Sequence, residues 1–179
     1  RSAKAELTLQ ELFESYSEDR TARGRRSVAA MRQTAESWLL TIPDQERKPH
    51  GRLRVKPPAS VDWSRRRISE VTREQVAAQQ KRILATGKRT TGNRVLELIS
   101  AAFEYGKRAG LHTLENPAAG VEAAPEQERS RFLQANELPR FIEALEATPQ
   151  PWRDYFEVLL FVGFRRSATA AMRWQDVDL

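Results

Sequence analysis

The chain has 179 residues and a net charge of +6. Because 40% of its residues are hydrophobic, it can bury the core of one large domain or of two small ones. It contains no cysteine, which excludes disulfides and thiolate metal sites and fits a reducing cytoplasm. No apolar run approaches the roughly 20 residues of a membrane span, and no secretory signal is visible.

Two helices are predicted before Pro43. Thr8 and Glu11 form a T-x-x-E capping box, and the apolar residues that follow recur at the spacing of one helical face. Gly24 breaks the polar segment 19–26, and a second helix is expected from Ser27. The predicted buried faces contain Leu9, Leu12, Phe13 and Tyr16 in the first helix and Val28, Met31, Ala35, Trp38 and Leu39 in the second.

Residues 41–67 are predicted to form a long basic loop. The segment holds four prolines and eight Lys or Arg residues, and loops of this length are usually functional or disordered. A third helix follows, with Thr72 and Gln75 as a second capping box and its end near Gly87.

The segment 88–94 leads into a fourth helix, whose apolar stripe is the strongest in the chain. Gly110 suits the position after its last turn, and Asn116 followed by Pro117 is expected to begin a short helix. The stripe comprises Val95, Leu98, Ile99, Ala102 and Phe103.

A second unit is predicted after an Ala-, Pro- and Glu-rich linker at residues 123–130. Asn136 is expected to cap its first helix, and another helix covers about residues 152–162. No segment shows sustained alternation of polar and apolar residues, so strands are scarce and the predicted fold class is mainly α.

Basic residues are unevenly distributed. Residues 20–108 carry 21 Lys and Arg against eight Asp and Glu, a net charge of +13, so the remainder of the chain sums to −7. A concentrated basic block on an otherwise acidic chain favours a nucleic-acid partner over a merely solvated helical surface.

The last stretch of the chain carries the most specific motif. Arg165 follows Gly163 and the apolar run 158–162, and an arginine held rigidly at such a point with a free guanidinium suits phosphate binding. The stretch G-F-R-R-S, followed by R-W-Q-D-V-D-L, resembles the first catalytic box of tyrosine recombinases, the phage integrases. That box reads approximately T-G-x-R-x-S-E and then L-R-W-x-D-I-D.

Shorter matches to the same family occur in the expected order along the chain. They are the entry helix Thr8–Tyr16, the N-R…F-x-Y pattern of residues 93–105, Asn116-Pro117-Ala118, and the start of the catalytic domain at residues 131–138. The resemblance implies a SAM-like core-binding domain of about four helices at residues 1–122. Residues 131–179 would then be the N-terminal helices of the catalytic domain.

The resemblance also implies an activity. The parent protein would be a phage or prophage integrase that breaks and rejoins DNA through a 3′-phosphotyrosine, with Arg165 as the catalytic residue on the scissile phosphate. The chain departs from the family at Ala168, where Asp or Glu is usual, and at Val162, where Thr is usual. The remaining catalytic groups, including the nucleophilic tyrosine, would lie beyond Leu179, so the chain is expected to be truncated and unable to cleave DNA.

The resemblance places the second and fourth helices against DNA. Helix N-termini and Lys or Arg bind phosphates, and Asn93 is the candidate for a base contact because asparagine can read adenine with two hydrogen bonds. The candidate DNA-binding residues are Arg25, Arg26, Arg32, Lys88, Arg89, Thr91, Asn93 and Arg94. The basic residues at 47–67 either reach the DNA backbone or stay mobile.

Other chemistry is assigned to no site. Asp176 and Asp178 are a weak metal signal, and the two histidines lack a second ligand at metal spacing, so neither metal nor cofactor is predicted. Trp174 is expected to anchor the core, and the three tyrosines are expected in or near the core.

Two further functions stay open. The alternative to a recombinase fragment is a non-enzymatic helical DNA-binding or adaptor protein derived from an integrase domain. An RNA-binding protein is less favoured, because no aromatic platform for single strands is visible. The expected partner is double-stranded DNA resembling an attachment site, bound in the bacterial cytoplasm by an oligomer of the full-length protein.

Overall fold

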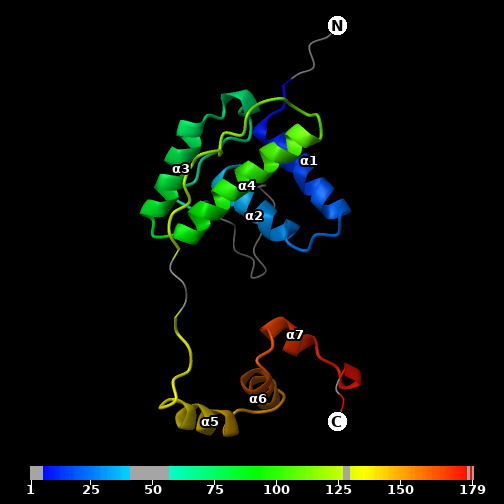
Figure 1. Cartoon of the computed structure of the whole chain (residues 1–179), viewed down its shortest axis with the longest axis vertical. Coiled ribbons are helices and arrows are strands. Elements are labelled where there is room, and N and C mark those ends of the chain that lie inside the picture. The colour runs from blue at the N-terminus through cyan, green and yellow to red at the C-terminus, as the bar shows by residue number, and fades with distance from the viewer. Residues whose placement is uncertain (1–5, 41–56, 127–129, 177, 179) are drawn as a thin grey trace. The chain divides into compact units, whose positions relative to one another are not determined.

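The computed structural model describes residues 6–40, 57–126, 130–176 and 178, and the regular structure within them is almost entirely helical. The chain divides into two compact units, Arg1–Gln127 and Glu128–Leu179, here called unit 1 and unit 2 (Figure 1). Among the described residues, the only β-type pairing is an isolated antiparallel bridge between Thr8 and Arg67. The predicted fold class, mainly α, is confirmed.

Two helices of unit 1, α1 and α3, begin at a residue whose side chain caps them. Thr8 Oγ1 accepts from the Glu11 N–H at 3.3 Å, and Thr72 Oγ1 accepts from the Gln75 N–H at 3.4 Å, so both predicted capping boxes are present. The described elements of unit 1 are α1 (Leu9–Ala22), α2 (Val28–Trp38), η1 (Ile68–Glu70), α3 (Arg73–Ala85) and α4 (Arg89–Arg108).

Helix α4 is the centre of unit 1, and it packs against α1, α2 and α3 (Figure 1). All five residues of its predicted apolar stripe are buried, with Phe103 only 1% exposed. They meet the predicted faces of α1 and α2, where Met31 is partly buried and Leu9, Leu12 and Trp38 are buried. Burying a side chain of this size stabilises a fold by about 1.5–3 kcal/mol, so this apolar contact fixes the positions of the three helices around α4.

Two predicted boundaries differ from the structure. Helix α4 begins at Arg89, so residues 89–94 form its first turns instead of leading into it. Asn116 begins a turn and not a helix. Its Nδ2 donates to Ser100 Oγ at 2.9 Å and to Glu104 Oε1 at 3.1 Å, and these bonds fasten the segment to α4.

His112 holds the loop that follows α4. Its Nδ1 accepts from the Leu114 N–H at 3.2 Å, and its ring meets Phe103 edge-on with centroids 5.5 Å apart. Its Nε2 is buried and has no hydrogen-bond partner in the described part of the chain. Burial lowers the pKa of His112 below its usual value, and the charge of nearby Lys107 acts in the same direction, whereas the Phe103 backbone and the charge of Glu104 oppose the shift.

Acid is expected to destabilise unit 1 through His112. Because the pKa in the folded state lies below the value of 6.5, the fold favours the neutral imidazole. The stability that the neutral His112 side chain contributes is fully present above pH 6.5 and is lost as the pH falls toward the pKa of the folded state. The thermal midpoint should therefore drop between about pH 7.5 and about pH 5, and the drop should be smaller in His112→Gln. A variant that loses as much stability in acid as the parent would exclude His112 as the cause.

Unit 2 contains α5 (Leu138–Glu146), α6 (Trp152–Val162), α7 (Arg166–Ala171) and η2 (Trp174–Asp176) among its described residues. The predicted cap at Asn136 is wrong, because Glu137 precedes the helix and its carboxylate accepts from the Gln134 N–H at 2.9 Å. That hydrogen bond, together with the 2.7 Å ion pair to Arg131, lowers the pKa of Glu137. Trp174 is not a core anchor, since its side chain is 85% exposed.

Candidate nucleic-acid interface

Two of the predicted DNA-binding residues, Lys88 and Arg94, lie where α2 and α4 pack together. Lys88, before α4, lies over the ring of Trp38 at the end of α2, with Nζ 5.2 Å from the ring centroid. Arg94, further along α4, lines a hollow together with Ser27, which precedes α2. The two helices therefore run in opposite directions. This surface is the α2/α4 face, and its cations are Arg20, Arg25, Arg26, Lys88 and Arg94.

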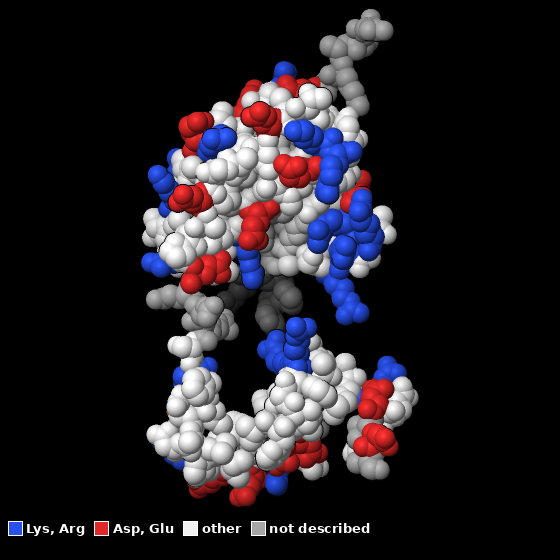
Figure 2. Space-filling model, viewed as in Figure 1, with Lys and Arg blue, Asp and Glu red and all other residues white. Residues whose placement is uncertain are grey.

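Arg25 and Arg26 occupy the turn between α1 and α2. Gly24 has a φ of +65°, a left-handed conformation that glycine adopts without strain, and it reverses the chain there. Both arginine side chains are exposed, and neither forms an ion pair within the described residues. Figure 2 shows Lys and Arg gathered on this side of unit 1, over the C-terminal end of α1. Phosphate contacts by Arg25 and Arg26 stay a prediction.

Arg20 belongs to the α2/α4 face although it was absent from the sequence-based candidates. Its Nη1 donates to the Tyr16 hydroxyl at 3.2 Å, and its Nη2 donates to Ser27 Oγ at 3.2 Å. These bonds direct the guanidinium of α1 toward α2. The spacing of four residues between Tyr16 and Arg20 was the available sequence signal, because residues four apart meet on a helix surface. The contact to Ser27, seven residues away across the turn, needs the tertiary structure.

Helical geometry separates the candidates in segment 88–94. Arg94 is exposed and lines the hollow beside α2, whereas Arg89 is exposed at the first position of α4. Thr91 is half-buried in the first turn. Arg89 and Thr91 stay candidates at the edge of the face, while Lys88 and Arg94 are the two with contacts toward α2.

Asn93 faces the interior of unit 1 and is only 4% exposed. Its Nδ2 donates to the Ala124 carbonyl and to Glu126 Oε1, both at 2.8 Å. Its Oδ1 accepts from the Ala124 N–H at 2.8 Å and from Gln80 Nε2 at 3.4 Å. Two donors and two acceptor positions are the full capacity of an asparagine amide. A base contact by Asn93 does not fit this arrangement, so it leaves the set of proposed DNA-binding residues.

These bonds fasten the start of the predicted linker to unit 1. Gln80 Nε2 also donates to the Glu122 carbonyl at 3.0 Å, so α3 and α4 hold the segment from both sides. We call this arrangement the linker latch, and it comprises Gln80, Asn93, Glu122, Ala124 and Glu126. Residues 123–126 were expected to belong to a free linker, but they are hydrogen-bonded to unit 1.

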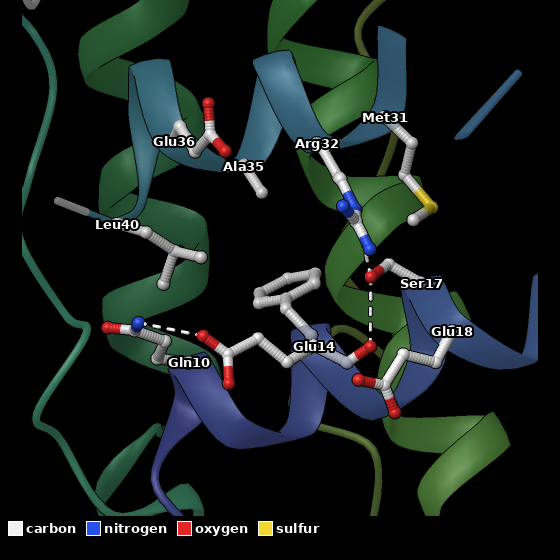
Figure 3. Close-up of a pocket in the computed structure, with 10 residues that line it drawn as sticks. Gln10, Glu14, Ser17, Glu18, Met31, Arg32, Ala35, Glu36 and Leu40 are labelled. Atoms are coloured by element: carbon white, nitrogen blue, oxygen red, sulfur yellow. Dashed lines mark hydrogen bonds between the residues drawn. The ribbon is translucent and has the colours of Figure 1, made fainter. Parts of the chain in front are cut away.

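Arg32 lies in a different hollow, between α1 and α2 (Figure 3). Its Nε donates to Ser17 Oγ at 3.0 Å, and Ser17 in turn donates to the Glu14 carbonyl at 2.9 Å. The carboxylates of Glu14, Glu18 and Glu36 line the same hollow, so three acidic groups surround one guanidinium. This setting repels a phosphate, and Arg32 is removed from the proposed interface.

The predicted basic loop lies partly outside the described residues, which resume at Pro57. In the described portion, Arg66 lies over the ring of Trp63 with 5.3 Å between its Cζ and the ring centroid. Trp63 is buried, and its N–H donates to the Leu39 carbonyl at 2.7 Å. Residues 57–67 are therefore attached to unit 1 at this point.

Arg165 lies between two helices of unit 2. Gly163 ends α6 with a φ of +67°, and Arg165 is the residue that precedes α7. The Arg165 carbonyl accepts from the Ala168 N–H at 2.8 Å and from the Thr169 N–H at 3.0 Å, which fixes its backbone. Its side chain is exposed and makes no hydrogen bond or ion pair with another described residue. The fixed backbone and exposed guanidinium agree with the expected geometry, but the preceding apolar run is not buried, since Phe161 is 78% exposed.

Tyr155 connects α6 to α7, because its hydroxyl donates to the Arg166 carbonyl at 3.1 Å. Ala168 lies within α7 and brings no polar side chain toward Arg165. Tyr16 is buried, and Tyr105 is half-buried with its hydroxyl 3.0 Å from Ser15 Oγ. The three tyrosines lie in or near packed regions, as predicted.

No group of three His, Asp or Glu side chains suited to a metal ion occurs in the described ranges. None of the helices described is both long and apolar enough to traverse a bilayer.

The helical fold and the arginine box point to one class of protein. The chain is similar in sequence to phage integrases and shares the fold of an integrase of known structure, in line with the resemblance that its motifs indicated. It is 26% identical over 110 residues to the integrase of Enterobacteria phage 434 and, to the same extent, to the integrase of Escherichia phage lambda. Each match covers 62% of this chain and 31% of the relative, so the chain spans about a third of their length. No protein-family model matches the chain.

Solved structures have the same fold. A lambda integrase dimer bound to a COC′ core site matches with a TM-score of 0.71 and 19% identity, over 97% of this chain and 44% of that one. A lambda integrase tetramer bound to a Holliday junction matches with a TM-score of 0.70 and 20% identity, over 96% of this chain and 45% of that one.

Proposed function

We propose that this chain is the DNA-binding part of a site-specific tyrosine recombinase of phage or prophage type. In full length that enzyme breaks and rejoins DNA through a phosphotyrosine intermediate. Residues 1–122 then form the core-binding domain, and residues 131–179 form the start of the catalytic domain. The relatives named integrase and the neighbours solved with DNA support this assignment.

The observation that carries the proposal is the α2/α4 face. Its five cationic side chains come from α1, the turn between α1 and α2, the residue before α4, and α4 itself, and none of them forms an ion pair within the described residues. Unpaired cations on a folded surface attract a polyanion and release its counterions on binding.

Arg165 supplies the second element of the proposal. A guanidinium whose backbone is already fixed can bind the non-bridging oxygens of a phosphate and stabilise the charge that develops in the transition state. In the intact enzyme Arg165 would therefore act as the first catalytic arginine. Ala168 gives it no neighbouring carboxylate, so any such support must come from another residue.

Salt-dependent binding tests the DNA-binding proposal. The logarithm of the affinity for a duplex should fall by about 0.9 per phosphate neutralised for each tenfold increase in salt. Fluorescence anisotropy with labelled duplexes between about 50 and 200 mM salt measures this slope. A chain that bound duplex DNA with no salt dependence, or preferred RNA in competition, would not be a core-binding domain of this kind.

The intact protein is proposed to act as an oligomer on attachment-site-like DNA in the bacterial cytoplasm. The neighbours solved as a dimer and as a tetramer on DNA support the oligomer.

The alternative is an adaptor that binds DNA without catalysis. A reading frame that continues past Leu179 for roughly 130–180 residues, with a His-x-x-Arg motif and a late tyrosine, would favour the enzyme, whereas a stop codon would favour the adaptor.

The 179-residue chain by itself is expected to form no covalent adduct on a nicked suicide substrate. Its tyrosines are buried or hydrogen-bonded within helices, and none is poised as a nucleophile. Denaturing gel electrophoresis measures the adduct. A band that shifted with the labelled DNA strand and disappeared in Tyr155→Phe would show that this chain carries a nucleophile after all.

A further inference from the structure

One hollow on the α2/α4 face is lined by the kinds of side chain that form a binding site for a single phosphate. It lies between the end of α1, the first half of α2 and the middle of α4, and it has a volume of about 320 Å³. Its polar and charged lining comes from Tyr16, Arg20, Ser27, Thr34, Arg94 and Glu97. None of the sequence motifs indicated this site, because its cations are 74 residues apart in the chain, at positions 20 and 94.

Arg20 is held in the hollow by neutral groups. Tyr16 and Ser27 accept from its two Nη atoms, and the guanidinium also lies over the Tyr16 ring, 5.6 Å from the centroid. No carboxylate pairs with it in the described part of the chain, so its positive charge is fixed in place but not neutralised. A guanidinium immobilised in advance loses less entropy when it binds an anion.

Arg94 brings a second cation to the same hollow from α4. It makes no hydrogen bond or ion pair with any described residue, so it is free to turn toward a ligand. Glu97 lies one turn further along α4 and also lines the hollow. The formal charge of the three side chains is +1, which matches the single negative charge of a phosphodiester better than the double charge of a phosphate monoester.

Ser27 completes the set of donors. Its Oγ accepts from Arg20, which leaves its own hydrogen without an acceptor among the described residues. Two guanidiniums and one hydroxyl therefore line the hollow, and these are the donor groups that the two non-bridging oxygens of one phosphate accept from. Thr34 is not counted, because its hydroxyl already donates to the Ala30 carbonyl at 2.9 Å.

We propose that this hollow binds one backbone phosphate of duplex DNA, with Arg20 and Arg94 sharing that phosphate and Ser27 as a third donor. The inference rests on the proposed DNA-binding function and names one fixed contact within it. Arg20 provides the rigid cation, Arg94 closes over the phosphate from α4, and Glu97 restricts the site to a singly charged group.

The shared phosphate gives a distinctive result in salt titrations of duplex binding. Arg94→Gln should lower the salt slope by up to about 0.9 and the affinity by roughly eightfold at 0.1 M salt. Arg20→Gln should do the same, but the double variant should lose only about 0.9 in total, because both residues serve one phosphate. A loss of about 1.8 in the double variant would mean two separate phosphates and would overturn the proposal.

Further variants separate a binding role from a structural one. Arg94 has no described partner, so its variant should fold like the parent, which circular dichroism checks. Arg82→Gln, on the exposed side of α3, removes the same charge outside the hollow and should leave the slope unchanged. Glu97→Gln should raise duplex affinity, by about threefold, because it removes the acid from the hollow.

The outcomes also separate this inference from the function on which it rests. If the parent chain binds duplex DNA with the expected salt slope and Arg20→Gln and Arg94→Gln keep that slope, the hollow is not a phosphate site and the proposed function stands. If the parent does not bind duplex DNA, both fail. Inorganic phosphate added at matched ionic strength should compete weakly, and competition in the micromolar range would identify a site for free phosphate instead.

Discussion

Replacing Arg25, Arg26 and Lys88 together by glutamine is expected to weaken duplex binding by roughly several hundredfold at 0.1 M salt. Each lost phosphate contact removes about 0.9 from the salt slope, so three contacts remove about 2.7. The three side chains are exposed at opposite ends of α2, so the change removes charge from the whole length of the α2/α4 face without touching the apolar core. Anisotropy titrations at several salt concentrations measure both the affinity and the slope.

The matched control removes the same charge elsewhere in unit 1. Arg73, Lys81 and Arg82 are exposed on α3, away from the contact between α2 and α4. Their triple glutamine variant should lower the affinity by less than about tenfold, because only the general attraction of net charge is lost. Equal losses in the two triple variants would show that DNA binding depends on net charge and not on the α2/α4 face.

Asn93→Ala is expected to lower the free energy of unfolding of unit 1 by about 2–4 kcal/mol. The substitution removes four hydrogen bonds and leaves the N–H and carbonyl of Ala124 without their side-chain partner, while Gln80 keeps only its bond to the Glu122 carbonyl. Residues 122–126 should then lose protection against hydrogen exchange, because the linker latch is open. Urea denaturation and hydrogen-exchange mass spectrometry of the full chain measure the two effects.

Glu126→Gln is the control for this prediction. A glutamine oxygen can still accept from Asn93 Nδ2, so the variant should lose less than about 0.5 kcal/mol. Duplex affinity should change by less than about threefold in both variants, since neither alters the α2/α4 face. A variant Asn93→Ala that stayed fully stable but lost discrimination between DNA sequences would restore Asn93 as a base contact and contradict the latch.

The separation of Asn93 from Arg94 shows why neighbouring candidates in the sequence have different roles. Successive residues of a helix differ by about 100° in direction, so Asn93 enters the interior beside α3 while Arg94 lines the hollow beside α2. The sequence pattern indicates both residues as DNA contacts, because it predicts that segment 88–94 leads into the helix and is not part of it. The position at which α4 begins decides which side chains point outward.

Other features were predictable from the sequence because their causes are local. The capping boxes at Thr8 and Thr72, the apolar stripe of α4 and the glycine before Arg165 each depend on residues within a few positions of one another. The motif around Arg165 also indicated the relationship to phage integrases, since the order of residue types in such a box is a property of the sequence itself.

Tertiary structure alone decided which basic residues can act together. Arg20 and Arg94 line the same hollow because α1 and α4 pack on the same core, whereas Arg32, only a few residues from Arg26, lines a different hollow together with three glutamates. Composition fixed the excess of positive charge in residues 20–108, which favours a nucleic-acid partner. Packing determined where that charge is left unpaired, because an ion pair or a shared anion requires distances that a linear sequence does not specify.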